Sequence, residues 1–386
     1  MVGKGDEQAG TGAQTANVIL VTSSLGCGGA ERVLSDMANY WSKLGWQVAF
    51  ATWSGREVRD FYPLDRRVRR EWLDVDSPND SSVAKLRAHA RRKRRLRALV
   101  AEIQPDAVLS FIDWSNVVTI LATRGLDTRV VVSERVHPAH HPNLARTWKA
   151  LRKLVYRMAD RVVAQTTDVQ QWLSSNCGAR TETIPNPLRD LPLMHCERQP
   201  MILGVGRLRP QKGFDLLLRA FAEARRHFTG WRVLIVGAGP ERDALMKLAR
   251  ELGIDACVEI VEPRKDIEVL MASAGIVVQP SRFEGFPNVV LEAMGMGAPV
   301  IAADCQSGPS EIIEDGVNGR LVPVEDVDEL ANAMTDLMSQ PHLRARLGAA
   351  AKSVRWRFGQ EQIMNMWEQC LVPSRSGEAF DRGERD

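Results

Sequence analysis

The sequence has few cysteines, and their spacing argues against two classes of protein. Six cysteines are scattered over 386 residues, with no Cys-x-x-Cys pair and no histidine at metal-ligand spacing. A disulfide framework and a zinc site are therefore both disfavoured. The pattern fits a reducing cytoplasm. No apolar run approaches the length that spans a bilayer, so any membrane contact is expected to be peripheral.

Two further features are missing from the sequence. Residues 1–16, MVGKGDEQAGTGAQTA, lack the apolar core of a signal peptide, and we predict a disordered leader there. Short-period repeats of the solenoid type are also absent. The chain does have 29 glycines, 19 prolines and a soluble composition that is 44% hydrophobic and 26% charged. The chain is too long to fold around one ordinary hydrophobic core, so its length predicts two domains.

One pattern recurs along the chain: a short β-branched run, a glycine-rich or polar turn, and an amphipathic helical stretch. The runs of the first half are NVILVTSS, QVAFATW, DAVLSFI, RVVVSE and DRVVAQT. Those of the second half are MILGVGR, RVLIVGAG, CVEIV, GIVVQPS, APVIAAD and GRLVPV. Strands that alternate with helices predict an α/β fold of two doubly wound, Rossmann-like domains with parallel sheets, facing each other across a cleft.

Proline and helical patterns set the expected boundaries. Four prolines between the halves interrupt helix and strand alike. The predicted segments are an N-terminal domain over 17–186, a linker over 187–200, a C-terminal domain over 201–354, a helix over 355–372 that crosses back to the first domain, and a disordered tail over 373–386. In the last helix, Ile363, Met366, Trp367 and Leu371 recur at helical spacing.

Three glycine-rich turns follow predicted strands: SSLGCGGAERV, GVGRLRPQKGFD and VGAGPERDAL. Such turns let backbone amides approach a phosphate. The last two lack the third glycine of a dinucleotide fingerprint, so NAD binding is not supported, and a tight turn that closes a strand remains an alternative. Arg207 and Lys212 flank the second turn. They could neutralise a departing diphosphate without a metal ion, or be ordinary solvated cations.

The stretch FEGFPNVVLE places Glu284 and Glu292 on either side of a turn. We predict that Asn288 caps a helix beginning near Val289, with the amides of Val289 and Val290 directed at a ligand. Carboxylates accept hydrogen bonds from vicinal hydroxyls, so one acid could hold a ribose and the other a hexose. A nucleotide-sugar fits this arrangement. Alternatively, Glu284 could be a surface acid, and Glu292 could be an acid that favours the first turn of the helix.

From about Asn17 to Leu371 the sequence resembles the retaining glycosyltransferases of family 4, which have the GT-B fold. The motifs that carry the resemblance are GGAERV, GVGRLRPQKGFDLLLRAF, LIVGAGPERDAL, FEGFPNVVLEAMGMGAPVIA and SGPSEIIEDGVNGRLV. Within the family it is most similar to bacterial enzymes of the N-acetylgalactosaminyltransferase and exopolysaccharide type that act on lipid-linked acceptors. The segment SFIDWSNVVTILATRGLDTRVVVSERVHP carries this narrower similarity.

The resemblance implies roles for individual residues. It implies that Glu284 contacts the donor sugar, that Glu292 holds the ribose hydroxyls, and that Arg207 and Lys212 bind the diphosphate. The candidates for catalysis are Arg207, Lys212 and Glu284. The donor-binding candidates are Glu292, Gly28, Gly29, Gly206, Gly285, Phe286, Pro287, Asn288, Val289 and Val290. The acceptor-side candidates are Glu31, Arg32, Glu134, Arg135 and His137.

The acceptor side departs from the family pattern. Many members carry a histidine in a short turn after the strand that here ends VVVSERVHP, whereas this chain has Glu134 and Arg135, with His137 slightly later. Glu134 or His137 could polarise the acceptor hydroxyl as a base. For His137, a capping or surface position is the favoured interpretation.

No metal and no cofactor are expected beyond the nucleotide-sugar co-substrate. Two Asp-x-Asp strings occur, Asp74-Val-Asp76 and Asp326-Val-Asp328. The first precedes a Ser-Pro loop, and the second opens a helix, where an acid is an ordinary cap. We interpret both as structural.

Positive charge is concentrated in the first half, although the net charge is only +3. Eight cations lie between Lys85 and Arg97 without one acid, and ARTWKALRKLVYRMADR has Trp148, Leu151, Val155 and Met158 opposite Arg146, Lys149, Lys153 and Arg157. Such helices could dock on anionic lipid or grip a lipid pyrophosphate, or they could be ordinary solvated faces. Nucleic acid is disfavoured because no aromatics interleave.

These observations predict a hexosyltransferase that moves a hexose or N-acetylhexosamine, with retention, from a UDP-sugar to a lipid-linked glycan in bacterial surface polysaccharide assembly. It would work at the cytoplasmic face of the inner membrane. The alternatives are a transferase with a soluble acceptor, another kind of GT-B enzyme such as an epimerase or phosphorylase, and a non-catalytic glycan-binding subunit. Four retained residues, Glu284, Glu292, Arg207 and Lys212, argue against the last alternative.

Overall fold

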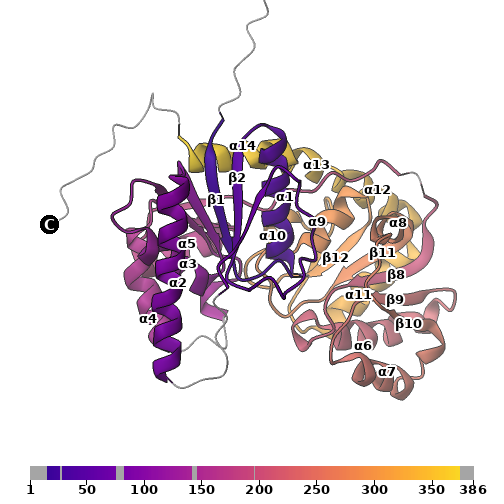
Figure 1. Ribbon diagram of the computed structural model, residues 1–386. Helices are drawn as coiled ribbons and strands as arrows, with labels where there is room; N and C mark the ends of the chain where they lie inside the picture. The colour runs from indigo at the N-terminus through magenta and orange to yellow at the C-terminus, as the bar shows by residue number, and fades with distance from the viewer. Residues whose placement is uncertain (1–14, 27, 75–81, 141–145, 195, 374–386) are drawn as a thin grey trace, which may run out of the picture. The chain divides into compact units, whose positions relative to one another are not determined.

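The computed structural model describes residues 15–26, 28–74, 82–140, 146–194 and 196–373 (Figure 1). The chain divides into two compact units. One runs to Val131 and includes the chain from Cys370 onward, and the other spans Val132–Gln369.

The described strands form two sheets. The seven-stranded sheet has the order β3-β2-β1-β4-β5-β6-β7, and the six-stranded sheet has the order β10-β9-β8-β11-β12-β13. Every pair with a resolved register is parallel. The first sheet consists of β1 (Asn17–Thr22), β2 (Gln47–Thr52), β3 (Arg69–Trp72), β4 (Ala107–Phe111), β5 (Arg129–Ser133), β6 (Arg161–Ala164) and β7 (Thr181–Thr183). The second consists of β8 (Gln199–Val205), β9 (Arg232–Val236), β10 (Val258–Val261), β11 (Ala274–Gln279), β12 (Val300–Ala303) and β13 (Arg320–Val322).

Helices connect these strands, as parallel pairing requires. The early helices are α1 (Gly29–Lys43), α2 (Ser82–Ile103), α3 (Asp113–Thr123), α4 (Arg146–Val155) and α5 (Thr167–Cys177). The later ones are α6 (Phe214–Ala224), α7 (Arg242–Glu251), α8 (Ile267–Ser273), α9 (Asn288–Gly295), α10 (Pro309–Ile312), α11 (Val327–Ser339), α12 (Pro341–Ala351), α13 (Val354–Arg357) and α14 (Gln360–Leu371). Single 3₁₀ turns are η1 (Pro138–His140), η2 (Tyr156–Met158), η3 (Pro210–Lys212), η4 (Arg225–His227) and η5 (Asp255–Cys257).

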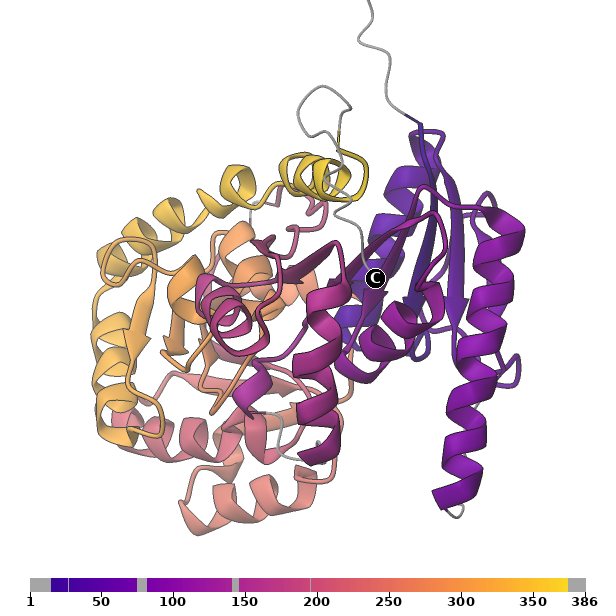
Figure 2. The ribbon, with the colours of Figure 1, turned by 90° about the vertical axis from the view of Figure 1, so that its left-hand side faces the viewer.

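The first unit is built around continuous apolar strands. Residues 18–21 of β1 are fully buried, which is typical of a parallel strand covered on both faces. Ile19 and Val21 pack in one cluster with Leu96 and Leu99 of α2. Figure 2 shows α2, in purple, as the long helix of this unit. The end of α14 also belongs here, because the Arg129 Nε donates to the Cys370 carbonyl at 2.8 Å.

The second sheet has a separate core on each face. Alternate residues of β8 enter different clusters, Ile202 in one and Leu203 in the other. The Ile202 cluster contains α6 and α11, whereas the Leu203 cluster contains α9 and α13. Two covered faces on a parallel sheet define a Rossmann-like domain. The prediction of an α/β fold with two such sheets is confirmed.

Several local expectations need correction. Pro200 is the second residue of β8 and not part of an irregular linker, because the first residues of a strand tolerate proline. In α14 the buried face includes Met364 and Cys370, while Met366 is only half-buried.

The basic stretch of α2 is only partly solvated. Arg92 is buried with its guanidinium 5.1 Å from the Trp114 ring centroid, and Arg97 donates to the Ala122 and Arg124 carbonyls at 3.0 and 2.7 Å. Arg95 donates to the Leu73 carbonyl. These three cations anchor α2, whereas Arg87, Arg91, Lys93 and Arg94 are exposed.

The α4 stretch also differs from expectation. Val155 is buried and Lys153 and Arg157 are exposed, as predicted, but Arg152 is buried and Leu154 is 57% exposed. The side chains of Lys85, Arg146 and Trp148, Asp76, Cys27, residues 1–14 and residues 374–386 lie outside the described part of the chain. Within the described part, none of the helices combines the length and the apolar character needed to cross a membrane.

Candidate active site

The turn after β8 and the loop after β11 are joined by several hydrogen bonds. These two strands are neighbours in the second sheet, so their carboxyl ends lie side by side. The Arg282 amide donates to the Gln211 carbonyl at 2.8 Å, and the Gln211 Nε2 donates to the Phe283 carbonyl at 2.9 Å. Arg282 also makes two hydrogen bonds to Asp215 of α6, at 2.9 and 2.8 Å. Burial raises the pKa of Asp215, but the Arg282 hydrogen bonds and charge lower it more.

These contacts bring Lys212 and Glu284 together. The Glu284 carboxylate is buried, and its Oε1 accepts from Lys212 Nζ at 2.6 Å, Ser281 Oγ at 2.7 Å and Gln279 Nε2 at 2.9 Å. All three bonds go to the same oxygen, which leaves Oε2 for another donor. Sequence reasoning missed Gln279 and Ser281, although polar residues at the carboxyl end of an apolar strand were a readable signal.

Two further groups mark this site as unusual. The Gln279 Oε1 is buried without a hydrogen-bond partner among the described residues, a condition that costs free energy and is uncommon outside functional sites. Burial and the nearby charge of Glu284 raise the pKa of the Cys305 thiol to about 12. A thiol with so high a pKa stays protonated near neutral pH, which disfavours a nucleophilic role for Cys305.

Glycines allow the two phosphate-turn candidates to touch. A Cβ on Gly237, after β9, would overlap the Gly206 carbonyl oxygen. The Lys212 side chain lies over Gly206, since a Cβ at 206 would sit 3.4 Å from three of its carbons. Arg207 is exposed at the same turn. The two predicted cations thus occupy one strand end.

The FEGFPN turn leads into α9 as expected, with a shift of one residue. Pro287 is the N-cap, and Asn288 is the first helical residue and makes no side-chain capping bond. The reason is that Asn288 Oδ1 instead accepts from Asn186 Nδ2 at 2.7 Å. The first hydrogen bond of the α-helical type runs from the Leu291 amide to the carbonyl of the N-cap, Pro287. The amides of Val289 and Val290 therefore precede the hydrogen-bonded part of the helix.

The rest of the turn is packed tightly. Phe286 is buried against Phe358, with ring centroids 5.8 Å apart, and Pro287 is buried beside Gly308. Gly308 has φ +140°, a value that favours glycine. The turn is thus held in one conformation by its neighbours.

Glu292 lies one turn into α9 and is also buried. Its Oε2 is 3.3 Å from Nη2 of Arg189, and Arg189 Nη1 pairs with Glu268 of α8. Arg189 comes from the predicted linker, and no sequence pattern drew attention to it.

The acceptor-side turn contacts the FEGFPN turn within the second unit. A Cβ on Gly285 would overlap the Arg135 carbonyl oxygen, so the two backbones are in direct contact. The Arg135 guanidinium donates to Asn186 Oδ1, and Asn186 in turn donates to Asn288. Sequence-distant segments 133–137 and 284–288 are thus joined by backbone packing and by one amide.

Glu134 and His137 have internal partners. Glu134 Oε1 accepts from the Tyr156 hydroxyl at 2.7 Å and lies 3.6 Å from Arg152 Nη1. His137 is 1% exposed, so the surface interpretation is wrong. Its Nδ1 accepts from the Ala139 amide at 3.2 Å, in agreement with a capping role, and its Nε2 is 3.3 Å from Asp168. Their roles toward an acceptor stay predictions.

The remaining candidates belong to the first unit. Gly28 is the N-cap of α1 and Gly29 is its first residue. Glu31 folds back against Gly28, where a Cβ would overlap its carboxylate, and the Arg32 amide donates to the Gly28 carbonyl at 3.1 Å. These four residues form one helix start, and their part in ligand binding stays a prediction.

Asp326 is a helix cap. Its Oδ1 accepts from the Glu329 amide at 2.9 Å at the start of α11, as expected for a structural acid. Among the described residues, no three His, Cys, Asp or Glu side chains gather in a way that could hold a metal ion.

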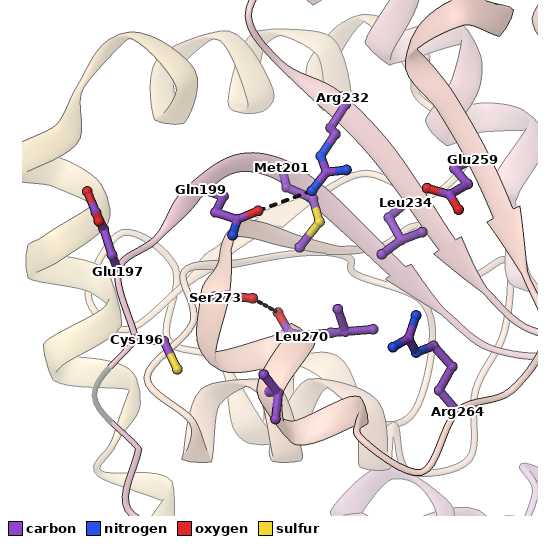
Figure 3. Close-up of a pocket in the computed structure, with 11 residues that line it drawn as sticks. Cys196, Glu197, Gln199, Met201, Arg232, Leu234, Glu259, Arg264, Leu270 and Ser273 are labelled. Carbon is purple, nitrogen blue, oxygen red and sulfur yellow. Dashed lines mark hydrogen bonds between the residues drawn. The ribbon is translucent and has the colours of Figure 1, made fainter.

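A separate pocket of about 590 Å³ lies in the second unit (Figure 3). Gln199 and Arg232 begin β8 and β9, and both line it together with Glu259 and Arg264. It therefore lies at the amino ends of the strands, whereas Lys212 and Glu284 lie at the carboxyl ends. Parallel sheets of this type bind their ligands at the carboxyl ends, so this pocket is distinct from the candidate active site.

The fold and the site together define a glycosyltransferase of the GT-B class. Residues 27–189 match the family model of Glycosyltransferase Family 4, and residues 193–354 match that of Glycosyl transferases group 1. The chain belongs to these families and is a glycosyltransferase.

Curated relatives span nearly the whole chain. An uncharacterized glycosyltransferase of Haemophilus influenzae is 28% identical over 89% of this chain and 96% of its own. The amylovoran biosynthesis glycosyltransferase AmsD of Erwinia amylovora is 28% identical over 92% and 99%. A Campylobacter jejuni α-1,4-N-acetyl-D-galactosaminyltransferase, named for an acceptor linked to PP-undecaprenol, is 25% identical over 92% and 98%. The chain thus has homologues in bacterial polysaccharide biosynthesis.

Solved structures agree on the fold. Sucrose-phosphate synthase of Thermosynechococcus elongatus has a TM-score of 0.81 at 20% identity, over 92% of this chain and 98% of its own. Anabaena HepE in complex with UDP has a TM-score of 0.76 at 22% identity, over 92% and 99%.

Proposed function

We propose that this chain transfers a hexose or N-acetylhexosamine from a UDP-sugar to a hydroxyl of a lipid-linked glycan, with retention at the anomeric carbon and without a metal ion. The observation that carries the proposal is the Lys212–Glu284 pair, 2.6 Å apart at the carboxyl end of a parallel sheet, with Arg207 exposed beside it. HepE was solved with UDP and with UDP-glucose, which supports a uridine donor.

The chemistry follows from this charge arrangement. The bond between the anomeric carbon and the diphosphate oxygen breaks, and the acceptor oxygen bonds to the same face of that carbon. The acceptor proton passes to a donor phosphate oxygen. Arg207, Lys212 and the first amides of α9 stabilise the charge that develops on the diphosphate. Glu284 Oε2 accepts from a sugar hydroxyl, and Glu292 accepts from the ribose. NMR of the product tests retention, because the coupling constant of the anomeric proton reports the configuration at that carbon.

Donor binding is the first test. We expect one of a panel of UDP-, GDP- and ADP-sugars to bind in the presence of EDTA, as measured by saturation-transfer NMR. Lys212→Ala should weaken that binding about 10- to 100-fold, because a charge-assisted hydrogen bond contributes about 1.5–3 kcal/mol. Lys247→Ala is the matched control, since Lys247 is an exposed lysine of α7. Binding that requires a divalent ion, or that ignores Lys212→Ala, would overturn the proposed site.

The lipid-linked acceptor is proposed from the Campylobacter relative and from the cations of α2. Arg87, Arg91 and Arg94 are exposed at positions i, i+4 and i+7, so they share one face of the helix. Each cation near an anionic bilayer contributes about 1 kcal/mol. Because Arg92, Arg95 and Arg97 already bond inside the unit, the outer cations are the ones available to lipid.

Vesicle sedimentation tests this docking. The protein should sediment with phosphatidylglycerol-containing vesicles at low salt, and the Arg87→Gln, Arg91→Gln, Arg94→Gln triple variant should stay in the supernatant. A triple variant with the same charge loss elsewhere, Arg226→Gln, Arg250→Gln, Arg346→Gln, should behave as the wild type, because these exposed arginines lie in the second unit. Equal sedimentation of both triple variants would contradict a role for α2.

A further inference from the structure

Arg189 occupies a fixed place beside the proposed ribose site. Its neighbours Leu188 and Leu191 are both 4% exposed and pack in the same apolar cluster as Val290 and Leu291 of α9. The Leu188 amide donates to the Phe358 carbonyl at 2.7 Å. The segment that carries Arg189, which belongs to the predicted linker, is therefore anchored against the helix that carries Glu292.

The Arg189 guanidinium joins two acids from different helices. Nη2 lies 3.3 Å from Glu292 Oε2, and Nη1 pairs with Glu268 Oε1. Only 6% of the Glu292 side chain is exposed, against 27% for Arg189. Buried charged groups are normally paired, and Arg189 is the paired cation here. Burial alone would lower the pKa of Arg189, but Glu292 and the hydrogen bond to Glu268 raise it, so the guanidinium stays charged.

We infer that Arg189 is a positioning residue for donor recognition: it holds the Glu292 carboxylate in one rotamer, so that the carboxylate can accept from the ribose hydroxyls. Glu268 anchors the guanidinium from the other side and fixes its direction. This inference rests on the proposed function, in which Glu292 holds the ribose. It adds a residue from the linker to the determinants of nucleotide affinity, and it assigns that residue an effect on the ribose alone.

The test compares each nucleotide with its 2′-deoxy form. We would measure by calorimetry the Kd values of UDP and 2′-deoxy-UDP, and of GDP and 2′-deoxy-GDP, for the wild type and for Arg189→Met, Arg189→Lys and Glu292→Gln. The wild type should prefer the ribonucleotide it binds by about tenfold, the value of one buried hydrogen bond to a charged group. In Arg189→Met and Glu292→Gln the ratio should fall to about one, and Arg189→Lys should restore only part of it, because a single ammonium cannot pair with both carboxylates as the guanidinium fork does.

A merely structural role would give a different pattern. Loss of packing would weaken both members of a pair equally and leave their ratio unchanged, which would overturn the inference. A double-mutant cycle adds a second criterion: in the Glu292→Gln background, Arg189→Met should change the Kd by less than about twofold, because the two residues act as one unit. Thermal melts would show that the variants are folded, and Glu268→Gln should give a partial loss of the ratio.

The outcomes separate the inference from the proposed function. If Glu292→Gln keeps the full preference for the ribonucleotide, the ribose role of Glu292 is wrong, and the inference fails with it. If Glu292→Gln abolishes the preference but Arg189→Met does not, the proposed function stands and only the inference is overturned.

Discussion

Replacing Glu284 by glutamine is expected to lower the transfer rate at saturating donor by about 10²–10³-fold, the usual loss when a group that acts in the transition state is removed. Glutamine keeps the size of the side chain and an oxygen for Ser281 and Gln279, but it removes the charge that faces Lys212. Affinity for the nucleoside diphosphate should be kept or increased, because Lys212 would no longer be neutralised by an acid 2.6 Å away. The measurement pairs initial rates with calorimetry of UDP.

Glu259→Gln provides the matched control for this prediction. Glu259 is an exposed acid at the amino edge of the second sheet, where it lines the separate pocket. Its loss should leave rate and affinity unchanged within about twofold, as for most exposed charges. A Glu284→Gln enzyme with the wild-type rate would show that the carboxylate only orients Lys212. A parallel loss of rate and UDP affinity would point to a collapsed site.

The meeting of Lys212 and Glu284 could be predicted from the sequence because parallel strands bring their carboxyl ends to one edge. GVGR and GIVVQPS are apolar runs followed by polar residues, so the sequence shows where each of these strands ends. The eleven β-branched runs all form strands in the described chain. Burial on both faces of a parallel sheet makes such runs continuous and easy to recognise.

Two strands gave no such signal. β3 reads RREW and β7 reads TET, and these are the outermost strands of the seven-stranded sheet. An edge strand is paired on one side only, and charged residues are common there, so composition does not reveal it. The pairing of β3 with β2 is a long-range contact that local pattern cannot specify.

The partners of the buried charged residues could not be predicted from the sequence either. The chemistry of Glu134, His137 and Glu292 marks them as candidates, but their partners Tyr156, Asp168 and Arg189 lie 22, 31 and 103 residues away along the chain. The spacing of residues along the chain does not predict such long-range pairs. For the same reason the run of cations between Lys85 and Arg97 does not single out Arg92, although its guanidinium lies over the Trp114 ring.

Gly237→Ala is expected to disturb the turn after β8, which carries Arg207 and Lys212, although the substitution adds only one methyl group. The added Cβ would overlap the Gly206 carbonyl oxygen, and backbone cannot move aside as a flexible side chain can. Gly206 carries Arg207 directly and lies under Lys212, so its displacement would misplace both cations. Overpacking of this kind costs about 1–3 kcal/mol. We expect a melting temperature lower by several degrees and nucleotide binding weakened about tenfold or more.

Gly230→Ala makes this prediction specific. Gly230 precedes the same strand, β9, and a Cβ there meets nothing within 4 Å. The substitution should leave binding unchanged and the melting temperature equal or slightly higher, because alanine restricts the unfolded chain. Thermal melts and calorimetry of UDP on both variants decide the matter. If Gly237→Ala matches Gly230→Ala in both measurements, the close approach of the two strand ends does not position the cations, and Arg207 and Lys212 must be held by the η3 contacts to the loop after β11 alone.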